Sequence, residues 1–226
     1  MNETGMSLEK PNYITAREHY IIASTLGHSE AAYRLTFLNS TNRVSCSADY
    51  TLAINVFRNG IAKGDIPSLV YLGEMYENGI GIEKDFPNAI NYYLKAEKAG
   101  NADAMVNLSL LERDGKYLKQ NLDSAKERMN NAARRGSAKA LYYNYRLGAF
   151  DTYRNIDSHR AELIRQAKRG DPYAQVFIYL AANEGFFDFP KLTDSAINPY
   201  STFLEMATHQ GFSGAQVILG HQTSTN

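Results

Sequence analysis

Hydrophobic and polar positions along Ile66–Gly100 follow the period of two consecutive α-helices. In two segments, Pro67–Asn78 and Asp85–Ala99, apolar or small residues recur every three or four positions, which places them on one side of each helix. The loop 79–84 separates the segments, and Gly100 ends the second with a residue that tolerates the left-handed conformation of helix C-termini. This stretch predicts two helices joined by a loop.

The same pattern returns along the whole chain. Each copy of the second helix has a small or mixed residue, a large one four positions later, a small one three later and a glycine four after that. The closing glycines are Gly27, Gly64, Gly100, Gly136, Gly170 and Gly211, spaced by 37, 36, 36, 34 and 41 residues. The first helix recurs as a small residue four positions after each glycine and a larger one four further on. A two-helix period of this length predicts an α-solenoid, in which neighbouring units supply each other's core.

The string from Ser68 to Asp85 resembles the Sel1-like repeat, the bacterial relative of the tetratricopeptide repeat, and Ala89–Gly100 completes the match. The matching positions are Leu72, Gly73 and Tyr76 in the core, Gly79 and Gly81 in the loop, and Asp85 at the start of the second helix. The resemblance implies an all-α, right-handed α-solenoid of about six helix-turn-helix repeats with partial terminal units.

The repeat boundaries predict three regions. We expect residues 1–12 to be a flexible N-terminus, residues 13–221 to form a single Sel1-like repeat domain, and residues 222–226 to be a disordered tail. Residues 13–27 supply only a second helix and Ser213–His221 only a first helix, so both are expected to act as caps.

Departures from the repeat are the places where a partner contact is expected. Glu112 stands where the reference unit has Tyr76, and Asn144 replaces a core leucine. The loops at 39–47 and 186–198 are longer than the repeat requires, and long loops on a compact scaffold often carry function.

Composition narrows the possible partners. The 24 Lys and Arg residues balance 24 Asp and Glu residues, which gives no support for nucleic-acid binding or for attraction to an anionic membrane. A single cysteine, Cys46, excludes an internal disulfide framework and a cysteine-based zinc cluster. No apolar stretch approaches the length of a membrane-spanning helix and no signal-peptide core is present, so we expect a soluble cytoplasmic or periplasmic protein without membrane insertion.

Candidate chemistry is sparse. Glu205 and His209 have a one-turn spacing that could bring two ligands to a metal, but no third ligand is evident and a surface pair is the favoured interpretation. Gly79-x-Gly81 follows a helix and lacks the lysine of a phosphate-binding loop. The sequence therefore predicts no catalytic, cofactor-binding or metal-binding residues, and a protein that is not an enzyme.

The expected function is binding of another protein. In tetratricopeptide-like solenoids the first helices line the concave surface, and the resemblance carries this over to positions two and six after each small residue. The candidate partner-binding residues are Tyr33, Phe37, Glu74, Leu110, Tyr142, Arg146 and Leu180 on first helices, with Phe186, Phe187 and Phe189 in the long loop.

Family members include adaptors in signalling or envelope assembly and immunity proteins that occlude a toxic effector, so either role is implied. Two alternatives stay open. The chain could be an enzyme or small-ligand protein with a pocket near Phe186–Asn198, or a structural protein that associates with itself through its ends.

Overall fold

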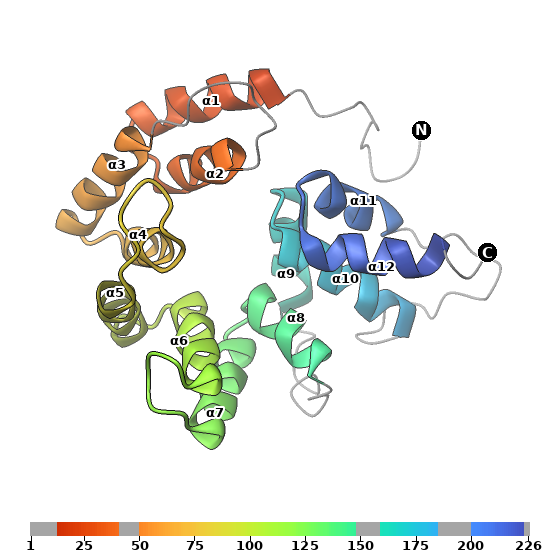
Figure 1. Cartoon of the computed structure of the whole chain (residues 1–226). Helices are drawn as coiled ribbons and strands as arrows, with labels where there is room; N and C mark the ends of the chain where they lie inside the picture. The colour runs from red at the N-terminus through yellow and green to blue at the C-terminus, as the bar shows by residue number, and fades with distance from the viewer. Residues whose placement is uncertain (1–12, 41–49, 148–158, 185–199, 224–226) are drawn as a thin grey trace. The chain divides into compact units, whose positions relative to one another are not determined.

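The computed structural model describes residues 13–40, 50–147, 159–184 and 200–223, and every regular element among them is an α-helix (Figure 1). The helices are α1 (Tyr13–Thr25), α2 (Ser29–Ser40), α3 (Thr51–Ala62), α4 (Ile66–Asn78), α5 (Phe86–Lys98), α6 (Ala102–Asp114), α7 (Leu122–Arg134), α8 (Ala138–Arg146), α9 (Arg160–Lys168), α10 (Pro172–Glu184), α11 (Ser201–His209) and α12 (Ser213–Thr223). The expected all-α repeat fold is confirmed, and α4 and α5 match the two segments predicted from Ile66–Gly100. None of the described helices is long and apolar enough to cross a membrane.

The chain divides into two compact units, Met1–Asp85 and Phe86–Asn226. The first contains α1 to α4 and the second α5 to α12, and each buries apolar residues of its own. The single domain expected over residues 13–221 stays a prediction, and each unit is described by itself.

Tyr71 of α4 holds the first unit together. Its ring stacks on Tyr33 of α2 with centroids 4.3 Å apart, and it contacts Phe57 of α3 at 5.5 Å. Its hydroxyl donates a hydrogen bond to Glu30. Burial and the neighbouring Glu30 carboxylate raise the pKa of Tyr71 well above its usual value, so the hydroxyl keeps its proton. One side chain thus joins three of the four helices.

The second unit is built around α10, which packs on α8, α9 and α11. Residues 174–179 of α10 are all buried, so this helix has no fully polar face. Its one buried amide, Gln175, donates to the carbonyl of Ala167 on α9 at 2.9 Å and accepts from Gln210, which follows α11, at 3.1 Å. A buried polar side chain is stable only when hydrogen-bonded, and here both ends of the amide have partners.

The six closing glycines found in the sequence all adopt left-handed backbone conformations, with φ between 81° and 91°. At Gly100 the amide donates to the carbonyl of Glu97, and the next amide, of Asn101, donates to that of Ala96 five residues back. The other five turns repeat these two bonds, which is the Schellman arrangement that satisfies the last carbonyls of a helix. A side chain with a Cβ is strained at this φ, and this is why glycine recurs there.

The residue after the glycine starts the next helix. It is Asp65, Asn101, Ser137 or Asp171 in four of the six turns. The side chains of Asn101, Ser137 and Asp171 each accept a hydrogen bond from the backbone amide three residues on, at 2.9, 3.2 and 2.8 Å. In these turns the glycine therefore ends one helix and the next residue caps the following helix. This fixes the number of residues between the two helices.

The departure at Glu112 has an internal explanation. Arg128 of α7 places Nη1 at 2.6 Å from Glu112 of α6 and Nε at 2.7 Å from Glu97 of α5. The residues 36 positions earlier are Tyr76 and Tyr92, so two tyrosines of the reference unit are replaced together by an acid and a base. Burial lowers the pKa of Arg128, but the hydrogen bonds that Arg128 donates to Glu112 and Glu97, together with the attraction of these carboxylates, outweigh this and raise it, so the guanidinium is charged.

Two further departures are satisfied in the same way. Ser109, at the position of Gly73, donates to the carbonyl of Ala125 at 2.6 Å, and Asn144 donates to Asn130 at 3.2 Å. Both side chains are buried. Contacts within the second unit therefore explain Ser109, Asn144 and Glu112, and no contact with another protein is needed to account for them.

We expect Arg128→Met to lower the free energy of unfolding by about 1–3 kcal/mol, because Glu97 and Glu112 would be left half-buried without a cation. Chemical denaturation monitored by circular dichroism measures the change. The matched control is Arg113→Met, whose exposed ion pair with Asp114 should contribute less than about 0.5 kcal/mol. Equal effects of the two substitutions would contradict the role given to Arg128.

We expect Gln175→Leu to cost about 1–3 kcal/mol, because the change leaves the Gln210 amide without its acceptor and removes one of the donors to the Ala167 carbonyl in a buried region. Gln166→Leu is the control, since Gln166 is half-buried on α9 and the structure gives its side chain no hydrogen bond. A loss in Gln175→Leu no larger than in Gln166→Leu would show that the amide network is dispensable.

Candidate functional site

Five residues of the second unit form a surface of rings and cations. They come from the first helices α8 and α10 and from the turn before α12. They are Lys139, Tyr143, Arg146, Tyr173 and Phe212, together called the aromatic-basic surface. Tyr173 lies 4.8 Å from Phe212 and 6.0 Å from Tyr143 between ring centroids. Lys139 lies over the Tyr173 ring at 5.6 Å. All five are at least partly exposed.

Tyr142 supports this surface from beneath. Its ring makes edge contacts with Tyr143 at 5.4 Å, Tyr173 at 5.6 Å and Phe212 at 5.4 Å, and only 4% of the residue is exposed. Gly214 of α12 lies so close that a Cβ there would overlap the Tyr142 hydroxyl. The ring thus fixes α8, α10 and the start of α12 relative to one another within this unit.

Arg146 is the exposed cation of the surface. Its Nη1 donates to the Tyr142 hydroxyl at 3.1 Å, and the guanidinium lies 5.9 Å from the centre of that ring. The hydrogen bond to Tyr142 raises the pKa of Arg146 above its usual value, so the group is always charged. Within the described ranges no carboxylate forms an ion pair with it. Arg146 is thus held in place by a neutral group, with its charge open to a ligand.

The ammonium group of Lys139, unlike the Arg146 guanidinium, has a hydrogen-bond partner on another helix. Its Nζ donates to Oδ1 of Asn107 on α6 at 2.6 Å, and the side chain is half-buried. Asn107 is buried, and its hydrogen bond with Lys139 connects the adjacent first helices α6 and α8. Lys139 adds positive charge beside Tyr173 without being as accessible as Arg146.

The other candidates from the sequence are spread over both units. Tyr33 is half-buried against Tyr71, and Phe37 is 38% exposed on α2. Glu74, Leu110 and Leu180 are half-buried. Phe186, Phe187 and Phe189 lie outside the described residues, as does most of the loop pocket proposed for an enzyme. Among these candidates, Tyr142 and Arg146 contact each other directly.

Sequence reasoning missed Lys139, Tyr173 and Phe212. Phe212 follows the closing glycine, where four other repeats have a capping Asp, Asn or Ser, so its signal was an aromatic ring at a polar position. Tyr173 directly precedes the small residue of α10 and had no repeat signal. Their proximity to Tyr143 depends on how three helices pack.

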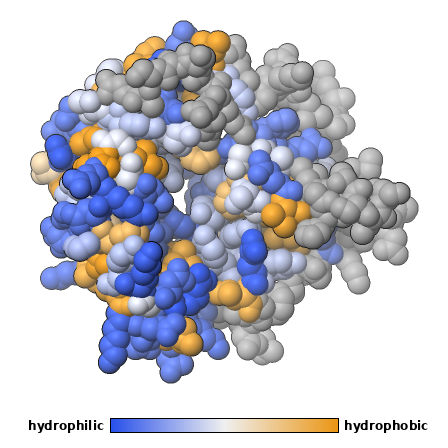
Figure 2. Space-filling view, viewed as in Figure 1, coloured by the Kyte–Doolittle hydropathy of each residue, from blue (hydrophilic) through white to orange (hydrophobic). Residues whose placement is uncertain are grey.

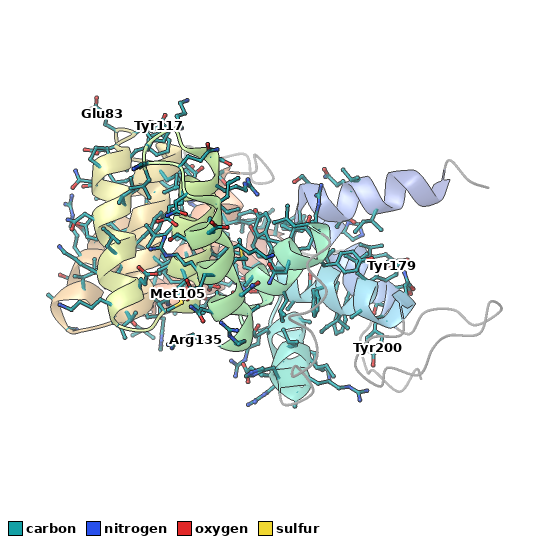
Figure 3. All side chains as sticks on the ribbon, turned by 90° about the horizontal axis from the view of Figure 1, so that it is seen from below. Glu83, Met105, Tyr117, Arg135, Tyr179 and Tyr200 are labelled. Atoms are coloured by element: carbon teal, nitrogen blue, oxygen red, sulfur yellow. The ribbon has the colours of Figure 1, made fainter. Side chains whose placement is uncertain are left out.

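A second exposed aromatic lies in the loop between α6 and α7. Tyr117 is 40% exposed and stacks on Phe86 with centroids 3.4 Å apart. Figure 3 shows Tyr117 and Arg135 at opposite ends of this helix pair. One repeat earlier Gly81 lies against Tyr50 instead, where a Cβ would overlap the ring. The stack therefore replaces a close backbone contact, and packing explains it.

No group of three or more His, Cys, Asp or Glu residues in the described part of the chain is placed to hold a metal ion. Glu205 and His209 are both exposed on α11. Hydrophobic residues on the face shown in Figure 2 occur in small patches separated by hydrophilic ones.

Comparison with known sequences identifies the repeats. The sequence model of the Sel1 repeat matches residues 1–28, 66–101 and 102–137. The chain therefore contains Sel1 repeats. Proteins with Sel1 repeats are generally non-catalytic scaffolds for protein interaction. The five residues of the aromatic-basic surface follow the matched stretches, although Lys139 contacts α6, which lies within one of them.

Three of the proteins similar to this chain show the extent of the likeness. The chitin synthase regulator SKT5 of Saccharomyces cerevisiae is 28% identical over 133 residues, which is 58% of this chain and 19% of that protein. A protective antigen of uropathogenic Escherichia coli with an SLR fold is 20% identical, with a TM-score of 0.46 over 91% of this chain and 51% of that one. A Sel1 repeat protein from Oxalobacter formigenes is 19% identical, with a TM-score of 0.48 over 93% and 89%. The chain thus spans about a fifth of the regulator and about half of the antigen.

We expect Gly214→Ala to destabilise the protein by about 1–3 kcal/mol, because the new methyl group forces Tyr142 or α12 to move. The cost should fall by at least about 0.5 kcal/mol in a Tyr142→Phe background, where the overlapping hydroxyl is absent. Urea unfolding of the two single variants and the double variant measures this coupling. Additive effects would mean that Gly214 and Tyr142 are not in contact.

Proposed function

We propose that the aromatic-basic surface of the second unit binds an acidic segment of a partner protein. The observation that carries this proposal is the state of Arg146, which is charged, exposed and positioned by Tyr142 but has no carboxylate beside it among the described residues. A guanidinium prefers planar carboxylates and can hold one with two parallel hydrogen bonds.

The aromatic rings near Arg146 also favour binding of a segment of a partner protein. Tyrosine and arginine are enriched among the residues that dominate binding energy at protein interfaces. Tyr143, Tyr173 and Phe212 already pack against Tyr142, so a partner would order few side chains on binding and lose little affinity to entropy. Lys139 adds a second positive charge over the Tyr173 ring.

We infer that the bound partner is either recruited, as by an adaptor, or blocked, as by an immunity or inhibitor protein. The yeast relative is named as a regulator of an enzyme, which supports control of another protein as the role of such repeats. If the role is inhibition, the surface would act by covering the partner's active site. The two roles differ in whether saturating amounts of this chain abolish the partner's activity.

A display library of random peptides tests the proposal. Peptides selected on the full chain should be enriched in Asp and Glu, and their binding should weaken as salt rises. Calorimetry with the best peptide should show Arg146→Glu binding at least about tenfold more weakly, which is about 1.4 kcal/mol.

The matched control is Arg169→Glu, an equal change of charge at an exposed position that follows α9. It should bind the peptide as the unchanged chain does. Selected peptides without acidic residues, or equal losses in both variants, would refute the aromatic-basic surface as the binding site.

A further inference from the structure

Charge and aromatic rings are distributed unequally over the aromatic-basic surface. Of its five residues Arg146 is exposed, and the other four are half-buried. The ammonium of Lys139 donates to Asn107 of α6 and lies over the Tyr173 ring, so it is directed at neighbours within the unit. A ligand therefore meets one accessible guanidinium beside a surface made of aromatic rings.

This distribution fits a ligand with a single carboxylate at the contact. Arg146 donates to the Tyr142 hydroxyl through Nη1, and a carboxylate can pair with the Nε and Nη2 donors, which this bond does not use. A second carboxylate placed over the rings would lose its water without gaining an accessible cation, which is unfavourable. Runs of acids and phosphate groups are recognised instead by clusters of arginines.

The rings form a continuous contact around Tyr142. Tyr173 is the middle ring of the three, and its centroid lies 6.0 Å from that of Tyr143 and 4.8 Å from that of Phe212. Their planes are inclined by 41° and 75°, so the surface presents both ring faces and ring edges. The three rings extend over no more than these two distances together, which is close to the about 9 Å that three residues of a polyproline II helix cover.

A polyproline II segment matches these rings better than a strand or a helix does. The described residues offer no strand edge, since their regular elements are all helices. A helix as short as this surface is marginal in water, whereas polyproline II is a common conformer of unfolded chains and proline fixes it in advance. Its carbonyls make no internal hydrogen bonds and can accept from the hydroxyls of Tyr143 and Tyr173, while proline rings pack on aromatic side chains.

Phe212 supports the same conclusion from the repeat. It stands at the position where Asn101, Ser137 and Asp171 each cap the following helix through a side-chain oxygen. A phenylalanine side chain cannot make this bond, so the turn before α12 gives up a stabilising cap. In exchange it gains a half-exposed ring that packs on Tyr142 and extends the aromatic surface.

We propose that the bound segment is a short polyproline II stretch in which one Asp or Glu is flanked by prolines. The acid pairs with Arg146. The prolines pack on Tyr143, Tyr173 and Phe212. This ligand rests on the proposed function, because it uses the same surface and the same acid, and it adds the residues that surround the acid.

Four peptides of equal length test the ligand on the full chain by calorimetry. They are a proline peptide with one central Glu, the same peptide with Gln for Glu, the same with Ala for every Pro, and an alanine peptide with three adjacent Glu. The first should bind at least about tenfold more tightly than each of the others. Equal or tighter binding of either alanine peptide overturns the ligand, and the proposed function then stands if Arg146→Glu weakens that binding. Absence of binding by every acidic peptide refutes both.

Removing one ring tests the proline contact. Phe212→Ser restores the kind of polar residue found in other repeats, so the variant should keep its circular dichroism spectrum. It should bind the proline peptide with Glu at least about threefold more weakly and the alanine peptide with one Glu unchanged. Tyr117→Ser is the matched control, since it removes a 40% exposed ring from the loop between α6 and α7 and should alter neither affinity. Equal losses for the two peptides in Phe212→Ser, or no loss for the proline peptide, overturn the contact.

Discussion

The turn at each closing glycine is the constraint on which the rest of the structure depends. Its left-handed residue satisfies the last carbonyls of one helix, and the next residue caps the following helix in most repeats. Because two residues do both tasks, the angle and register of the two helices vary little from one turn to the next. The positions that become core are thereby fixed relative to each glycine, as Ala89, Tyr93 and Ala96 are to Gly100.

A scaffold fixed in this way can exchange contacts within a repeat without changing the fold. The second unit replaces two tyrosines by Glu112 and Arg128, and a glycine by Ser109, and each new polar group finds a partner inside the unit. The same freedom allows Tyr142, Tyr173 and Phe212 to gather on neighbouring first helices. A departure from the repeat is therefore a candidate for function only where its side chain is left accessible, as that of Arg146 is.

The repeat also explains why the described ends differ from the middle. A helix with a neighbour on one side only keeps apolar positions exposed, and Val217 of α12 and Leu26, which follows α1, are exposed. Such exposure is costly in water unless another helix covers it.

The sequence alone determined the helices, their boundaries at the glycines and the repeat family, because these depend on local backbone conformation and on a periodicity of three to four residues. It also singled out Tyr142 and Arg146, since both stand at repeat positions on a first helix. Only the tertiary structure decided that Tyr142 is covered and Arg146 is not, that Lys139, Tyr173 and Phe212 join them, and that Glu112 and Asn144 are satisfied internally. These properties depend on which side chains of different helices meet in space, as Arg128 and Glu97 do at 31 residues apart and Asn144 and Asn130 at 14, and the repeat pattern contains no information on such pairings.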